Sequence, residues 1–115
     1  MSYSLAMSEG NSEAADLLAE RVVAAMYERD AASRAIGLEI LEARAGQVTV
    51  AMQVRADMLN GHAICHGGFI FAMADSAFAF ACNSFNDVTV AAGVTIDFLA
   101  AAREGDRLIA TARVV

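Results

Sequence analysis

The most informative pattern of hydrophobic and polar positions lies between Cys65 and Cys82. A run rich in Ala, Phe and Met follows a His-Gly-Gly sequence, and a single carboxylate, Asp75, interrupts it. The apolar residues fall on nearly every side of a helix, which is typical of a buried helix. Residues 77–81 also alternate with period two, but the run is too long and too poor in β-branched residues for a strand. We therefore predict a central buried helix around which the chain folds.

The N-terminal third of the chain predicts one amphipathic helix. Residues 1–10 are small and polar, and we expect them to be disordered. From Asn11 onward, apolar residues recur at three- and four-residue spacing, which indicates a helix with one apolar face. The predicted helix ends between Asp30 and Ala35, and Gly37 marks its exit. The expected apolar face consists of Leu17, Leu18, Val22, Val23, Met26 and Tyr27.

Strand patterns lie on both sides of the central helix. Residues 38–43 and 47–55 alternate around an Ala-Gly turn and predict an antiparallel hairpin. Residues 88–99 and 107–115 predict two more strands. All four can join one antiparallel sheet around the helix, so we expect an α+β fold with a single domain over residues 1–115. Because the chain stops on an apolar strand, and an unpaired apolar edge invites aggregation, we also expect C-terminal strands of the fold to be missing from this chain.

Composition narrows the class of protein. The hydrophobic fraction is 57% of 115 residues, more than such a small domain can hide alone, so we expect an oligomer. The eight basic residues are all Arg and are scattered, and the net charge is −6; both argue against a nucleic-acid-binding face. No apolar run approaches the roughly 20 residues that a membrane-spanning helix needs. The N-terminus also lacks the basic start and apolar run of a signal peptide.

The two cysteines indicate a reducing compartment. Cys65 and Cys82 lie at opposite ends of the predicted helix, roughly 25 Å apart by the helical rise. A disulfide needs Cα atoms within about 7 Å, so an intrachain bridge is excluded. Reduced thiols and the lack of an export signal predict a cytoplasmic protein.

Short polar motifs surround the central helix. They are Met58–His62, Cys65–Gly68, Ala74-Asp75, Ala81–Ser84 and Thr95–Leu99. These motifs resemble those of the PaaI-type acyl-CoA thioesterases of the hotdog fold, which act in phenylacetate degradation, and the similarity runs from about Met26 to the C-terminus. The resemblance implies an antiparallel sheet wrapped around a long central helix, here with an extra N-terminal helix. It also implies an acyl-CoA substrate, no separate cofactor, a homodimer as the smallest unit and a homotetramer as the expected assembly.

A thioester hydrolase needs hydrogen-bond donors for the developing oxyanion and a base or nucleophile. The N–H groups of Gly67 and Gly68 open the predicted helix at the positive end of its dipole, so they form a candidate oxyanion hole. Asp75 is the candidate base or nucleophile. It lies eight residues beyond Gly67, roughly 12 Å along the helix axis, so one carbonyl cannot contact both groups in the same subunit. We therefore predict a site shared between two antiparallel copies of this helix, with two sites per dimer.

The resemblance assigns further roles. It implies that His66 orients the thioester carbonyl or its loop, and that Asn60 holds the attacking water. The acyl group stays open among aryl-acetyl, hydroxylated aryl and medium-chain groups, which all fit an apolar pocket. We expect further substrate contacts from Gly68, Phe71, Thr95 and Arg103.

Each assignment has a plainer alternative. His66 can serve only as a helix N-cap, and Asp75 can be a structural carboxylate bound to a hydroxyl such as that of Ser76. Cys65 precedes a helix N-terminus, which can lower a thiol pKa and make it a nucleophile. His62, Cys65 and His66 offer three metal ligands but no fourth is nearby, so we predict no metal site. For function, the alternative is a non-catalytic acyl-CoA-binding or regulatory module with the same fold.

Overall fold

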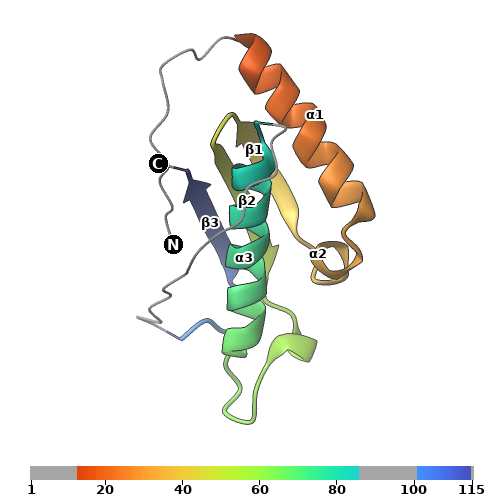
Figure 1. Ribbon diagram of the computed structural model, residues 1–115. Helices are drawn as coiled ribbons and strands as arrows, with labels where there is room; N and C mark the ends of the chain where they lie inside the picture. Colours follow the sequence, from red (N-terminus) through yellow and green to blue (C-terminus); the bar gives the residue numbers. More distant parts are fainter. Residues whose placement is uncertain (1–12, 86–100, 115) are drawn as a thin grey trace.

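The computed structural model describes residues 13–85 and 101–114 (Figure 1). The predicted strand over 88–99 and the predicted helix start at Asn11 lie outside this part of the chain. The described elements are α1 (Glu13–Arg29), α2 (Ala31–Ala35), β1 (Glu39–Arg44), β2 (Gln47–Gln53), the 3-10 helix η1 (Ala56–Met58), α3 (Gly67–Asn83) and β3 (Arg107–Arg113).

The strands form one antiparallel sheet in the order β1-β2-β3. β2 pairs with β3 along its whole length, from Gln47 opposite Arg113 to Gln53 opposite Arg107. β1 pairs with the other edge of β2, with one irregularity between Ile40 and Glu42. The predicted hairpin and the pairing of strands from both sides of the central helix are confirmed. In Figure 1, α3 lies across one face of this sheet.

The core lies between α3 and the sheet. The buried face predicted for residues 47–55 is confirmed, because Val48, Val50, Met52 and Val54 are all buried. The opposite face is not fully open, since Ala51 is buried as well. α3 contributes a matching set of buried side chains: Met73, Ala74, Ala77, Phe78, Phe80, Ala81 and Cys82. The long helix is therefore held by the sheet along most of its length, which gives its N-terminal end a fixed position.

α3 is nevertheless not buried on every side. Gly68, Phe71 and Asp75 are exposed, and their spacing of three and four residues places them on a single face. The prediction of a helix buried all round is wrong for a single copy of this chain, because the sheet covers only one side of α3. Asp75 is therefore exposed in a single copy of the chain, and its carboxylate is not desolvated as its sequence context predicted.

α1 buries a narrower face than its periodicity predicts. Ala19 and Val23 are buried, whereas Leu17 is 54% and Leu18 is 42% exposed. The C-terminal end is anchored by Tyr27, whose hydroxyl donates to the backbone carbonyl just before β1 at 2.5 Å. Leu17 and Leu18 stay exposed because α1 packs beside β1, at the edge of the sheet, instead of over its centre (Figure 1).

A break at Asp30 separates α1 from the short helix α2. The Asp30 carboxylate accepts hydrogen bonds from the Ser33 N–H at 3.0 Å and from Ser33 Oγ at 2.6 Å, so it caps α2. Gly37 then takes a φ of +68°, a conformation that favours glycine, and is the predicted exit toward β1. This arrangement sets α2 beside α3. Within the described residues, no helix is long and apolar enough to cross a membrane.

Candidate active site

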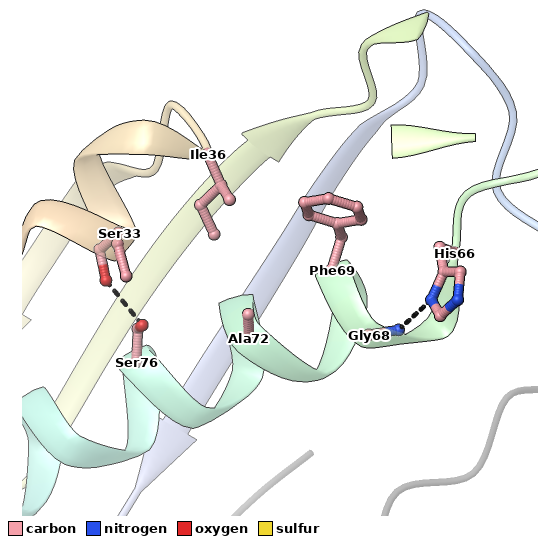
Figure 2. A pocket seen from close by; sticks show the side chains of 8 residues that line it. Ser33, Ile36, His66, Gly68, Phe69, Ala72 and Ser76 are labelled. Carbon is pink, nitrogen blue, oxygen red and sulfur yellow. Dashed lines mark hydrogen bonds between the residues drawn. The ribbon is translucent and has the colours of Figure 1, made fainter. Parts of the chain in front are cut away.

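α3 begins at a His-Gly-Gly cap. His66 has extended backbone, and its Nδ1 accepts a hydrogen bond from the Gly68 N–H at 3.0 Å (Figure 2). A Cβ at Gly68 would lie 3.2 Å from the same Nδ1, so any other residue would push the imidazole back by a few tenths of an ångström. A neutral imidazole that accepts at Nδ1 carries its proton on Nε2. His66 is therefore an N-cap, and its Nε2–H is left as a donor.

This cap changes the predicted pair of oxyanion donors. The Gly68 N–H donates to His66 Nδ1, as the N-cap alternative predicts, so it is not available to an oxyanion. The Gly67 N–H donates to no described backbone carbonyl. Gly67 and the Nε2–H of His66 therefore replace the glycine pair as candidate donors at the positive end of the helix dipole.

Asp75 lies on the exposed face of α3, eight residues beyond Gly67 and roughly 12 Å along the axis. Its carboxylate has no hydrogen-bond or ion-pair partner among residues 13–85 and 101–114. The hydroxyl of Ser76, the alternative partner, instead lies 2.7 Å from Ser33 Oγ. The described contacts thus give no structural role to Asp75.

Asn60 organises the loop that leads into α3. Its Oδ1 accepts from the His62 N–H at 2.9 Å and from the Ile64 N–H at 3.4 Å, and its own N–H donates to the Ile64 carbonyl at 2.8 Å. The side-chain oxygen is thus occupied, and the Nδ2 amide group is the part of Asn60 that can meet a water molecule. Ala63, inside the same loop, has a φ of +59°, a conformation that is uncommon for a residue with a side chain.

Arg103 lies near the beginning of α3. The carbonyl of its neighbour Ala102 accepts from the Cys65 N–H at 2.7 Å, which joins the two segments. Arg103 is exposed, and its backbone N–H donates to Asp106 Oδ2 at 2.8 Å. No described carboxylate pairs with its guanidinium. Of the other predicted substrate contacts, Phe71 is 44% exposed on the same face as Asp75, and Thr95 lies outside the described residues.

Three comparisons bear on this site. Residues 62–115 match a family model described as thioesterase superfamily. Over 90 residues the chain is 52% identical to acyl-coenzyme A thioesterase PaaI of Escherichia coli (strain K12), covering 78% of this chain and 64% of that protein. The solved structure of the E. coli PaaI protein from the phenylacetic acid degradation operon has a TM-score of 0.81 at 48% identity, covering 84% of this chain and 70% of that one. The chain belongs to the PaaI-type thioesterases.

The resemblance read from the motifs is thereby confirmed, and the fold is the hotdog fold. A more distant member of this fold, smu.793 from Streptococcus mutans UA159, was solved bound to acetyl CoA; it has a TM-score of 0.61 at 26% identity, with 64% of this chain and 60% of that chain covered. The chain spans 64% of the length of the E. coli thioesterase, which is less than two thirds.

Cys65 does not have the environment of a nucleophile. It is buried, and its Sγ lies 3.7 Å from the backbone oxygen of His66. Burial raises the pKa of the Cys65 thiol above its ordinary value, which opposes formation of the reactive thiolate. No three His, Cys, Asp or Glu side chains gather into a metal-binding group in the described part of the chain.

A pocket of about 370 Å³ opens between α2 and α3 beside His66 (Figure 2). The sequence did not single it out, because α2 has only five residues and is too short to give a periodic signal. The signal on α3 was present, since Phe69, Ala72 and Ser76 recur at three- and four-residue spacing. The lining residues are Ala32, Ser33, Ile36, His66, Gly68, Phe69, Ala72 and Ser76.

Proposed function

We propose that this protein is an acyl-CoA thioesterase that hydrolyses an acyl-CoA or aryl-acetyl-CoA thioester to a free acid and coenzyme A. The observation that carries the proposal is the exposed Asp75 carboxylate, which has no described partner, in a chain 52% identical over 90 residues to an E. coli acyl-CoA thioesterase. A carboxylate that held the fold together would contact other residues of the chain, and the exposed Asp75 makes no such described contact. An unpartnered one on an otherwise apolar helix face is available to a substrate.

Helix geometry supports a site shared between two subunits. Gly67 and Asp75 are separated by roughly 12 Å along one rigid helix, so one thioester carbonyl cannot reach both in the same chain. Two copies of α3 that pack antiparallel through the face of Phe71 would bring each Asp75 toward the partner's helix N-terminus. We take a homodimer as the smallest active unit and a homotetramer as the expected assembly. The shared site would be contradicted if light scattering showed the protein to be a monomer under conditions in which it hydrolyses thioesters.

The proposed chemistry uses few groups. The thioester carbonyl oxygen accepts from the Gly67 N–H and the His66 Nε2–H of one subunit, which stabilise the charge that develops on it. Asp75 of the other subunit removes a proton from the attacking water, or attacks the carbonyl carbon itself. Because a thiol has a pKa near 8.5, coenzyme A leaves as a thiolate with little acid assistance. Single-turnover hydrolysis in ¹⁸O water separates the two routes. If Asp75 activates water, the label enters the acid product directly; if Asp75 attacks and water then opens the anhydride at the Asp75 carbonyl, the first acid is unlabelled and the label stays in Asp75.

Other groups would support binding. The exposed Arg103 guanidinium, near the helix start, is suited to the phosphates of coenzyme A. The Asn60 Nδ2 group can donate to the attacking water. Cys65 and Cys82 are free thiols, which is consistent with the cytoplasmic location predicted from the sequence.

The Asp75→Asn substitution tests the function directly. It keeps the shape of the side chain but removes the base, so kcat should fall about 10³-fold, while the Kd for an acyl-CoA stays within about threefold. The matched control is Asp57→Asn, an exposed Asp paired with Arg55, which should leave kcat unchanged. The measurement is thiol release from a panel of acyl-CoA esters, with Kd from calorimetry. Binding of acyl-CoA without turnover by the unmodified protein would instead support the non-catalytic module.

A further inference from the structure

The pocket between α2 and α3 has two different ends. At one end lie His66 and Gly68, the cap of α3; at the other, Ser33 of α2 and Ser76 of α3 meet at 2.7 Å (Figure 2). Gly68 and Ser76 are eight residues apart on the same helix, so the pocket extends roughly 12 Å from the candidate oxyanion donors. The middle of the pocket is lined by apolar side chains: Ala32, Ile36, Phe69 and Ala72.

We propose that this pocket receives the acyl group of the thioester, and that Ala72 and the Ser33–Ser76 contact set how long that group can be. The inference rests on the proposed thioesterase function and adds the side chains that select the substrate. It uses residues of one subunit, unlike the shared reaction centre.

Continuity with the reaction centre identifies the occupant. A thioester carbonyl held at His66 carries the acyl group on one side and the coenzyme A sulfur on the other. Coenzyme A is long and anionic, and the exposed Arg103 offers it a cation near the same helix start. The pocket holds no carboxylate, ammonium or guanidinium side chain, so its chemistry matches an apolar acyl chain or ring and not a phosphate.

Hydrogen bonds fix the far end of the pocket. The Asp30 carboxylate can only accept, so the bond of 2.6 Å requires Ser33 Oγ to donate to it. The hydroxyl proton of Ser33 is then used, and Ser76 must donate to Ser33. The resulting chain from Ser76 through Ser33 to Asp30 ties α3 to α2. A longer acyl group must stop at this contact or break it.

Ala72 lies halfway along the pocket, so a larger side chain there should shorten it. Binding is measured by calorimetry with non-hydrolysable thioethers: S-ethyl-, S-butyl-, S-hexyl-, S-octyl- and S-decyl-coenzyme A. In the unmodified protein, affinity should rise about fourfold for each methylene that enters the pocket and then level off. In Ala72→Leu the affinity should level off at a shorter chain. Relative to the unmodified protein, S-octyl-coenzyme A should bind at least about tenfold more weakly and S-ethyl-coenzyme A should bind within about twofold. The matched control is Ala35→Leu, at an exposed position of α2 outside the pocket.

The outcomes separate this inference from the proposed function. Equal weakening of all five thioethers in Ala72→Leu, or an unchanged profile, overturns the pocket assignment even when acyl-CoA esters are hydrolysed with the expected dependence on Asp75. A shifted profile without any hydrolysis supports the pocket and contradicts the enzyme. Ala72→Val, a smaller filling of the same space, gives the same test with an intermediate shift should the Leu variant fail to fold in a thermal melt.

Discussion

The polar side chains on two faces of α3 differ in whether they have hydrogen-bond partners. On the face toward α2, the Ser76 hydroxyl is tied into the same chain through Ser33 and Asp30. On the face that carries Phe71, the Asp75 carboxylate has no partner in the described structure. One face is completed by the subunit's own residues, and the other has a carboxylate that the proposed function assigns to a site shared with a second subunit. Under that proposal, adjacent residues of one helix serve substrate selection and chemistry separately.

The sharpest test of this contrast is a mixed dimer. One subunit carries Asp75→Asn and the other Gly67→Pro, where proline removes the N–H but suits the first position of a helix. A shared site leaves one intact centre, so kcat should reach roughly half of the unmodified value, which is at least about 10²-fold above either mutant homodimer. The dimers are separated by two affinity tags and assayed for thiol release. Activity no higher than that of the mutant homodimers would place both groups of each centre in one chain.

His66 joins the two faces, because it caps α3 and lies at the mouth of the pocket. His66→Asn should keep the cap, since Asn is a good N-cap residue, but remove the Nε2–H donor; kcat should fall about 10²-fold with stability unchanged. His66→Ala should lose the same activity and also about 1 kcal/mol of stability. Urea unfolding and steady-state kinetics measure both effects. Full activity in His66→Asn would mean that His66 serves only as the N-cap of α3.

Ser76→Ala should have the smallest effect of these substitutions, and it should change stability more than activity. Ser33 still donates to Asp30, so only one half-buried hydrogen bond is lost, and the free energy of unfolding should fall by about 1 kcal/mol. The kcat for a short acyl-CoA should stay within about twofold, because Ser76 does not reach the carbonyl. A large loss of kcat for acetyl-CoA would mean that the two faces of α3 are not independent.

The sequence predicted the parts of the fold that carry long periodic signals. The central helix was found because its Ala-, Phe- and Met-rich run extends over 17 residues, and the hairpin because residues 47–55 alternate regularly. The exposure of Leu17 and Leu18 was missed because periodicity shows which residues share a face, but not how much of that face a neighbour covers.

Site geometry was predictable only in part. Asp75 and Gly67 were chosen as candidates from their types and spacing, and His66 from the resemblance to a known family. The separation along the helix led to the prediction of a second subunit. The loss of the Gly68 N–H to His66 depends on a side-chain rotamer, which spacing does not encode. The pocket beside Ile36 depends on how α2 docks, and a helix of five residues leaves no periodic trace.

The hydrogen bond from the Cys65 N–H to the Ala102 carbonyl has a consequence for the order in which the molecule is completed during synthesis. When the ribosome has synthesised the chain as far as Asp75, the candidate site residues His66, Gly67 and Asp75 are all present. The hydrogen bond that anchors the start of the helix needs Ala102, which is 37 positions after Cys65. The start of α3 is therefore fixed by this bond only after Ala102 has been synthesised and has reached Cys65.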